Sequence, residues 1–379
     1  MDHKERMLTA IYERGVPDKV PHGDVMVDPK VMSKLLGCQV LPEYVNYLIF
    51  WMTEPFDDDF FNKELRVREM LAFDFAHVFP REPLKKIGEN EEGYPIVRDI
   101  WGAEYIITPT TWIGLKAPVS DLRKVEEYKF PEVKDFSFDN LERWVRESDL
   151  FVVAQLDTGF FKIAQLIGFE QYMLAVAEGR TKEIKLLMER LTTLQIKLAQ
   201  ECIRRGADCI WLANDFAWNG GPFINPEMLW ELDFQYEQEI IKAVHKMGVP
   251  CVLHACGNQN KTIDMIVEMG VDGIHALQPA AGNNIFQLRK RYGNRICLLG
   301  NVDISNLLPF GSPWDVDQMV RELIENVGKD GAYVLTTANA ICGDVPVENA
   351  IILHLAVEKY GHYTKKHGHY TKEGVRKGV

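Results

Sequence analysis

The chain has 379 residues, a length that fits one α/β barrel with insertions or two mid-sized domains. Hydrophobic residues make up 46% of the chain and charged residues 26%, the balance of a globular protein, which excludes global disorder. With 43 basic and 55 acidic residues the formal net charge is −12, and this acidity argues against nucleic acid or an anionic membrane surface as a partner.

The N-terminal segment, MDHKERMLTAIYERG, is charged and amphipathic and lacks the apolar run of a signal peptide. No stretch of the sequence reaches the roughly 20 apolar residues that span a bilayer. The chain has seven cysteines, and an odd number without an export signal is typical of reduced thiols, not of disulfides. We therefore expect a cytoplasmic protein in which some cysteines are free to act as ligands.

Two short apolar runs in the first part of the chain are candidate strands, at 20–25 and 75–79. Residues 81–148 then interrupt the pattern with a Gly/Glu-rich turn (GENEEGYP), a hairpin-like pair around GAEYIITPTTWIG, and a charged run that ends at KFPEVKDF. We expect this region to be an insertion that lies over a larger domain.

From residue 151 onward, short apolar runs alternate with amphipathic stretches of helical period. The expected helices are 226–247, 261–269, 285–292 and 314–327. The expected strands are FVVAQLD (151–157), DCIWLAN (208–214), PCVLHAC (250–256), GIHALQP (273–279), RICLLGN (295–301) and GAYVLTT (331–337). Apolar runs of this length between helices are typical of βαβ units and a parallel sheet that is buried on both faces.

Six such strands and the two weaker candidates give about eight, the number that closes a barrel. We therefore predict an α/β fold, a (β/α)8 TIM-type barrel over residues 1–361, with the insertion near 81–148. An open doubly wound sheet is the alternative, although no Gly-rich phosphate loop follows any strand. The basic tail 362–379, with its near-repeat of HYTK, is expected to be a solvated terminus.

Polar side chains follow almost every predicted strand. In a barrel the active site lies at the C-terminal ends of the strands, so these side chains are the candidates for a site. The candidates are His22, Asp24, Asp157, Asn214, Asp215, His254, Cys256, Gln278, Asn301, Asp303, Thr337, Asn339 and Cys342.

The pair His254-Ala-Cys256 is the most specific of these signals. On an extended segment residues i and i+2 point the same way, and an imidazole with a thiol suits zinc. Cys342 follows another strand, and Gln278 could offer a carbonyl oxygen; three protein ligands with an open fourth position are the catalytic pattern. The alternative is that these thiols are ordinary buried apolar groups, the interpretation we give to Cys202, Cys209, Cys251 and Cys297.

In the loop LANDFAWNGGPF, the aromatic residues Phe216 and Trp218 follow a strand end. They fit either core packing or a flat apolar substrate pocket, in which His22, Asp24 and Asn214 would also bind substrate. Another set, Asp215, Asn301 and Asp303, could position substrate or relay a proton, or could simply hold loops.

Several of these segments together resemble the uroporphyrinogen decarboxylase superfamily, and most closely its branch of zinc- and corrinoid-linked methyltransferases. The matching segments are VPDKVPHGDVMVDPKV, GADCIWLANDFAWNGGPFINPEMLWEL, VPCVLHACGN, GVDGIHALQPAAG, ICLLGNVDISNLLPFGSP and TTANAICGDVPVENA. The resemblance covers the barrel, whereas 81–148 has no matching motif.

The decarboxylases of this superfamily have an arginine- and glycine-rich N-terminal loop that grips the substrate's carboxylates. Residues 22–26, His-Gly-Asp-Val-Met, lack those arginines, and a substrate with many carboxylates needs cationic partners. Decarboxylation also needs no metal, so it would leave the His-x-Cys pair without a role.

In the methyltransferases, zinc is bound by a His-x-Cys pair and a distant Cys, often with a glutamate between. The resemblance thus implies His254, Cys256 and Cys342 as ligands, and Gln278 stands where the glutamate would be. Zinc with two thiolates and no carboxylate is neutral, and a neutral centre is the better electron-pair acceptor. This charge and the aromatic loop favour demethylation of an ether, with a methoxylated aromatic as one candidate, over methylation of a thiol.

We therefore expect a zinc-dependent methyltransferase, of the O-demethylase type, that works with a separate corrinoid protein. The chain shows no cobalamin motif of its own, so the partner would dock its corrinoid over the barrel mouth, beside 81–148. A methyl-corrinoid:thiol methyltransferase, a uroporphyrinogen decarboxylase-like lyase and a non-catalytic ligand-binding barrel are the alternatives. The sequence leaves the substrate, the direction of transfer and oligomerisation open.

Overall fold

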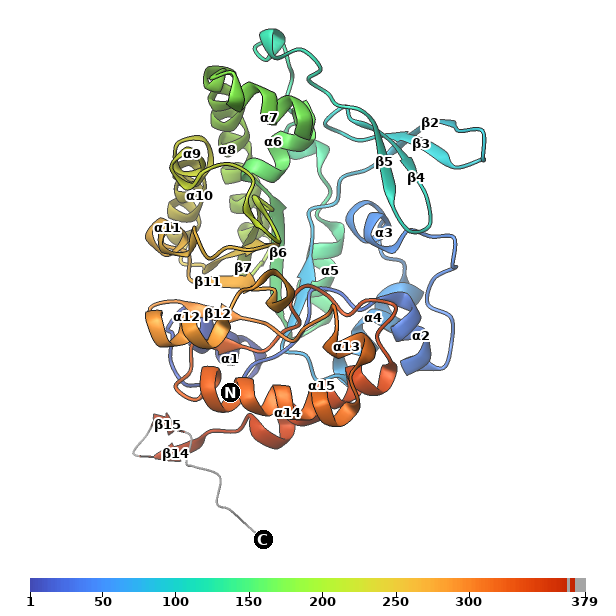
Figure 1. Ribbon diagram of the computed structural model, residues 1–379. Coiled ribbons are helices and arrows are strands. Elements are labelled where there is room, and N and C mark those ends of the chain that lie inside the picture. The colour runs from blue at the N-terminus through green and yellow to red at the C-terminus, as the bar shows by residue number, and fades with distance from the viewer. Residues whose placement is uncertain (367–368, 372–379) are drawn as a thin grey trace.

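The computed structural model describes residues 1–366 and 369–371, and its centre is one parallel sheet. Neighbouring strands pair in parallel along the whole sheet, and helices lie between them in the chain (Figure 1). The strand order is β1 (Phe75–Val78), β6 (Phe151–Asp157), β7 (Cys209–Ala213), β10 (Cys251–Ala255), β11 (Gly273–Ala276), β12 (Cys297–Leu299) and β13 (Tyr333–Val334).

Residues 20–25 occupy the place between the two edges of this sheet. Next to β13, the backbone of Leu335 pairs with Pro21 and Gly23. Next to β1, the Asp74 N–H donates to the carbonyl of His22. The expected strand at 20–25 is therefore a set of isolated bridges and not a continuous strand, but these bridges close the ring between β13 and β1. The predicted α/β barrel fold is confirmed.

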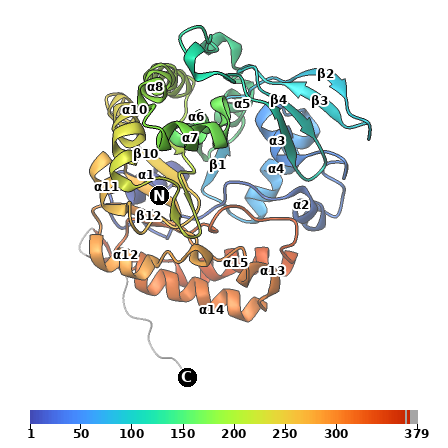
Figure 2. The same ribbon diagram turned by 45° about the horizontal axis from the view of Figure 1, so that its top comes forward.

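Helices surround the sheet (Figures 1 and 2). The longest, α8 (Thr181–Arg204), buries one stripe at three- and four-residue spacing: Ile184, Leu187, Met188, Leu191, Leu194 and Leu198. The others are α2 (Pro29–Leu36), α3 (Tyr47–Thr53), α4 (Asp58–Met70), α5 (Asp139–Glu147), α6 (Gly159–Ile167), α7 (Phe169–Ala177), α9 (Pro226–Leu229), α10 (Gln235–His245), α11 (Ile263–Met269), α12 (Ile285–Tyr292), α13 (Leu307–Phe310), α14 (Pro313–Leu323) and α15 (Val347–Tyr360). Within the described ranges, no helix has both the length and the apolar character that crossing a bilayer requires.

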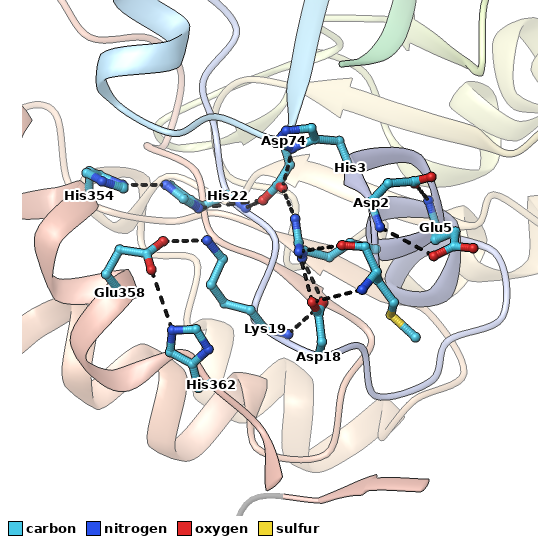
Figure 3. A network of polar contacts seen from close by, with 12 residues as sticks. Asp2, His3, Glu5, Asp18, Lys19, His22, Asp74, His354, Glu358 and His362 are labelled. Carbon is cyan, nitrogen blue, oxygen red and sulfur yellow. Dashed lines mark hydrogen bonds and ion pairs between the residues drawn. The ribbon is translucent and has the colours of Figure 1, made fainter. Parts of the chain in front are cut away.

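The first helix, α1 (His3–Ile11), lies across the N-terminal ends of the strands. It and the turn after it bond to aspartates that directly precede β1, β7 and β11: His3 and Arg6 to Asp74, Lys4 to Asp208, and Arg14 to Asp272. Figure 3 shows the Asp74 part of this network, which continues through His22 to His354 of α15.

The apolar face of α1 completes the interior of the barrel. Its buried residues Met7, Ala10 and Ile11 belong to one cluster with Phe75, Phe151 and Trp211, which come from β1, β6 and β7. This helix therefore seals the floor of the barrel, and the opposite end is the open one.

The region 81–148 begins with a separate antiparallel sheet, which projects to one side of the barrel near α3 (Figure 1). Its strands are β2 (Lys85–Glu89), β3 (Pro95–Arg98), β4 (Glu104–Ile107) and β5 (Trp112–Lys116). Two 3-10 turns follow (Leu122–Lys124 and Val133–Asp135), and then α5, which contacts β1 and β6 of the barrel. The division of the chain at 81, 148 and 361 stays a prediction.

Several short elements complete the description: β8 (Ala217–Trp218), β9 (Gly221–Pro222), a 3-10 turn (Pro279–Ala281) and π-helical turns at Trp230–Phe234 and Ile324–Gly328. In the tail, β14 (Thr364–Lys366) pairs antiparallel with β15 (His369–Thr371). The remainder of the predicted solvated tail, 367–368 and 372–379, lies outside the described residues.

Candidate metal centre at the barrel mouth

The candidate site lies where β7, β10 and β11 end. In the register of these strands His254 of β10 stands opposite Ala213 of β7 and opposite His275 of β11. Asp215 and Cys256 follow two residues and one residue after the ends of their strands. Parallel strands bring their carboxyl ends to one edge, so residues about 40 positions apart in sequence meet there.

Three of these side chains form a ligand group. The Nε2 atom of His254 is 3.6 Å from the Sγ atom of Cys256 and 4.0 Å from Oδ1 of Asp215. Ligand atoms of all three lie within 4.8 Å of one another. Nitrogen, sulfur and carboxylate oxygen are the donors that zinc takes in proteins, so the residues fit this metal. Of the sequence-predicted ligands, His254 and Cys256 are brought together.

Asp215 joins them in a position that the sequence analysis assigned to catalysis and not to the metal. Its Oδ1 accepts a 2.8 Å hydrogen bond from the backbone N–H of Cys256. The carboxylate is thus held against the loop that carries the thiol. In the methyltransferases of the superfamily a glutamate is often one of the zinc ligands, and Gln278 stands at its place in this chain. In the structure Asp215, and not Gln278, brings a carboxylate to the three-residue group.

The surroundings favour the neutral forms of Cys256 and His254 when no metal is bound. Burial and the Asp215 charge raise the pKa of the Cys256 thiol far above its usual value. Burial lowers the pKa of His254, which is 9% exposed, so the imidazole is neutral. Asn339 donates to Cys256 Sγ at 3.3 Å, a contact that favours the thiolate. A bound cation would supply the stabilisation of the thiolate that the protein alone lacks.

Two predicted ligands lie differently. Gln278 uses its Oε1 to accept from the Gly257 N–H at 2.8 Å, so the structure shows it supporting the loop. Cys342 is exposed, its thiol contacts the Ala340 carbonyl, and it is not a member of the three-residue group. Its loop reaches the group through Asn339 instead. Cys342 lines a groove of about 810 Å³ beside α2.

The two N-terminal candidates belong to the scaffold. His22 is fully buried; its N–H donates to Asp74 and its ring contacts His354 at 3.0 Å (Figure 3), in the network on the floor side. The buried Asp24 accepts from the backbone and hydroxyl of Thr337, at 3.2 and 3.0 Å. Both contacts hold residues 20–25 in the ring, and this corrects the expected role in substrate binding.

The aromatic loop is divided between core and surface. Phe216 is fully buried and packs edge-on against Phe234, which corrects its expected place in a substrate pocket. Trp218 of β8 is 58% exposed, and its carbonyl accepts from the backbone N–H of Asn258, two residues after Cys256. Of these two aromatic residues, only Trp218 has a side chain that a bound ligand or partner protein could contact.

Asn214 is also structural. It is fully buried and donates at 2.8 Å to Asp233 in a π-helical turn, while its Oδ1 accepts from the N–H of Phe161 at the start of α6. Glu237 lies in the same buried group. This set caps α6 and corrects the expected contact of Asn214 with substrate.

This buried pair of carboxyls predicts a loss of stability as pH rises. Burial raises the pKa of Asp233 to about 7, and burial together with Asp233 raises that of Glu237. Between about pH 4 and 7 the folded state keeps a proton that the unfolded state releases. We expect the free energy of unfolding to fall by on the order of 2–4 kcal/mol across this range, and to fall less in Asp233→Asn. Urea denaturation at a series of pH values measures the difference, and parallel profiles would show that Asp233 is ionised in the fold.

The side chains of Asn301 and Asp303 form hydrogen bonds to main-chain groups of nearby loops. Asn301 Nδ2 donates to the Leu277 carbonyl at 2.8 Å, where Ala276 and Leu277 both have positive φ, an unusual conformation for residues with side chains. Asp303 accepts from Ser305, at 2.7 Å, and from Asn306. For both residues, these contacts support the alternative that they hold loops, and not the alternative that they position substrate or relay a proton.

Sequence reasoning missed one contributor to the group, His275, and did not connect another, Asn339, with the thiol. His275 interrupts an apolar strand at the position that pairs with His254, and this shared register was the available signal. Asn339 was noted at a strand end, but nothing in the sequence connects it to Cys256.

Comparisons with known proteins place this geometry in context. The model of the family described as uroporphyrinogen decarboxylase (URO-D) matches residues 100–360. A uroporphyrinogen decarboxylase of Coxiella burnetii (strain Dugway 5J108-111) is 24% identical over 290 residues, 70% of this chain and 74% of that protein. Another, from Pseudoalteromonas translucida, is 27% identical over 191 residues, 49% of this chain and 51% of that protein.

Among solved structures, a methyltransferase from Methanosarcina mazei aligns with a TM-score of 0.69. The alignment covers 95% of this chain and 99% of that chain at 19% identity. A likeness at this identity shows a shared fold, and it extends over nearly the whole of both chains.

Proposed function

Because the chain belongs to the uroporphyrinogen decarboxylase family, we propose that it is a zinc-dependent methyltransferase within that family, which moves a methyl group between a small substrate and a corrinoid carried by a partner protein. One observation carries this proposal: Asp215, His254 and Cys256 converge at the open end of the barrel with ligand atoms within 4.8 Å of one another. A decarboxylase that works without metal has no use for such a group.

Each of the three residues has a defined part. His254 would bind the zinc ion through Nε2, Cys256 through Sγ and Asp215 through a carboxylate oxygen. One thiolate and one carboxylate balance the charge of the ion, so the centre is neutral. Bound there, zinc supplies a Lewis acid that accepts electron density from a substrate oxygen or sulfur. Asn339 and Gln278 hold the thiol and its loop in place.

The substrate that we propose is a methyl ether, with a methoxylated aromatic as the first candidate. A neutral centre favours activation of an ether oxygen over release of a bound thiolate. The groove of about 810 Å³ that contains Cys342 has the volume of a small-molecule site. The exposed Trp218, whose carbonyl accepts from Asn258 two residues after Cys256, suits contact with the corrinoid protein.

The second candidate is decarboxylation of a porphyrinogen, because the curated relatives that match carry that name. Against it, residues 22–26 lack arginine, and His22 and Asp24 are fully buried in contacts with the scaffold. Side chains so placed cannot receive the carboxylates of a tetrapyrrole.

A metal analysis combined with a methyl-transfer assay tests the proposal. We expect about one zinc ion per chain in the purified protein, and conversion of Co(I) cobalamin to methyl-Co(III) in the presence of a methoxylated aromatic. Transfer from methylcobalamin to a thiol alone would reverse the proposed direction. A metal-free protein that decarboxylates a porphyrinogen would establish the second candidate. A protein that contains zinc but transfers no methyl group in the assay would instead support a non-catalytic ligand-binding barrel.

A further inference from the structure

His275 lies directly behind the proposed metal ligand His254. The two Nδ1 atoms are 2.7 Å apart, and the rings come from paired positions of β10 and β11. His275 is fully buried, with its ring 4.7 Å from that of Trp211. Its Nε2 makes no hydrogen bond of ordinary geometry with any described residue, and its only polar contact is a weak one with the Thr337 backbone.

A contact of this length between two imidazole nitrogens is a hydrogen bond that holds one proton. If His275 donates, the neutral His254 carries its own proton on Nε2, the atom that faces Cys256 at 3.6 Å. If His254 donates from Nδ1, its Nε2 has a free lone pair. Only the second arrangement lets His254 bind a metal.

We propose that His275 is the positioning residue that accepts the Nδ1 proton of His254 and so fixes the tautomer and the ring orientation in which Nε2 binds the metal. The inference rests on the proposed function. Metal-bound histidines commonly donate their second N–H to a carboxylate or a carbonyl. A neutral imidazole in that place orients the ligand without adding negative charge, and the zinc centre stays a good electron-pair acceptor.

The same arrangement gives His275 no evident value for stability. When its Nδ1 accepts, its proton stands on Nε2, which is buried and has only a weak contact with the Thr337 backbone, outside ordinary hydrogen-bond geometry. A buried N–H without a partner destabilises a fold. An apolar side chain would serve the core at least as well, so metal affinity and stability should respond differently to substitution.

The test compares zinc affinity in four proteins by chelator competition, with the absorption spectrum of the cobalt-substituted forms as a second readout. His275→Phe removes the acceptor and should weaken binding by about 10–100-fold, the range for residues that orient a ligand. His275→Asn places an amide oxygen near the lost Nδ1 and should restore binding to within a few-fold. His275→Gln places it one bond further and should bind as weakly as the Phe variant.

His77→Phe is the matched control. His77 is also fully buried in the barrel, its ring is 5.5 Å from the ring of Trp211, and it bonds to Gln155 at 2.9 Å instead of to the metal group. We expect wild-type affinity from it and a similar thermal stability for the two Phe variants.

The possible results separate the inference from the function on which it rests. Equal zinc affinity in wild type, His275→Phe and His275→Gln would overturn the role of His275 while zinc in the wild type upholds the proposed function. A wild type that binds no zinc overturns both. If His275→Phe does not fold, the contrast between the Asn and Gln variants decides alone, and equal affinities for those two contradict the inference.

Discussion

Replacing Cys256 by serine is expected to remove zinc from the protein and to abolish methyl transfer. Cys256 supplies the only sulfur in the three-residue group, and its Sγ lies 3.6 Å from His254 Nε2. A serine hydroxyl stays protonated at neutral pH and is a poor zinc ligand. We expect the affinity for zinc to fall by more than about 100-fold, beyond the range of residues that only orient a ligand.

The measurement is metal content after dialysis, followed by the cobalamin assay. Cys38→Ser is the matched control for metal content, since Cys38 is an exposed free thiol outside the group and its replacement should leave the zinc content unchanged. Cys342→Ser answers a separate question. Loss of zinc there would mean that the exposed loop brings its thiol to the ion, as the sequence predicts. Full zinc content in Cys256→Ser would contradict the metal centre itself.

Replacing Asp74 by asparagine is expected to give the largest loss of stability. Asp74 is fully buried and accepts from Arg6 at 2.6 Å, from His3 at 2.9 Å and from the His22 N–H at 2.9 Å. The substitution keeps the size of the side chain but leaves the half-buried Arg6 without one of its two carboxylates. Breaking a buried ion pair in this way costs about 3–5 kcal/mol, which urea denaturation measures.

The pH dependence gives this prediction a second signature. Burial alone would raise the pKa of Asp74, but hydrogen bonds from His22 and His3 and the Arg6 charge hold it far below its usual value. Its contribution is therefore present above about pH 4 and is lost as pH falls further, so wild type and variant should converge in acid. Asp121→Asn, which affects an exposed pair with Arg123, should match wild type throughout. A stability difference that persists at low pH would show that packing, not charge, is responsible.

Much of the barrel could be predicted because buried parallel strands are marked by continuous apolar runs. The run 151–157 coincides with β6, and 208–214 and 250–256 each exceed β7 and β10 by one residue at both ends. The strand predicted at 273–279 is longer than β11, which ends at Ala276 because Ala276 and Leu277 have positive φ values. The types of the side chains do not reveal this backbone conformation. Residues 20–25 pair only at isolated bridges, which no periodicity can distinguish from a strand.

The part of the site that could be predicted is the part formed by residues close together in the sequence. His254 and Cys256 are two residues apart on one strand, so alternation places them together. Asp215 depends on the register between β7 and β10, which a single sequence does not encode. His22 was misplaced because a polar residue near a weak strand gives no sign of which end of the barrel it faces. Phe216 and Asn214 were misplaced because loop residues at a strand end can turn inward, toward Phe234 and Asp233.

The closure of the ring by residues 20–25 also has a consequence for how the protein is made. These residues are made long before their partner Leu335, which is far from them in the sequence. Until Leu335 is made, the nascent chain therefore carries an open sheet whose edge at residues 20–25 lacks its partner, a surface that invites pairing with other chains. Contacts between such distant parts of a sequence form slowly, so completion of the barrel is expected to be a late step of folding.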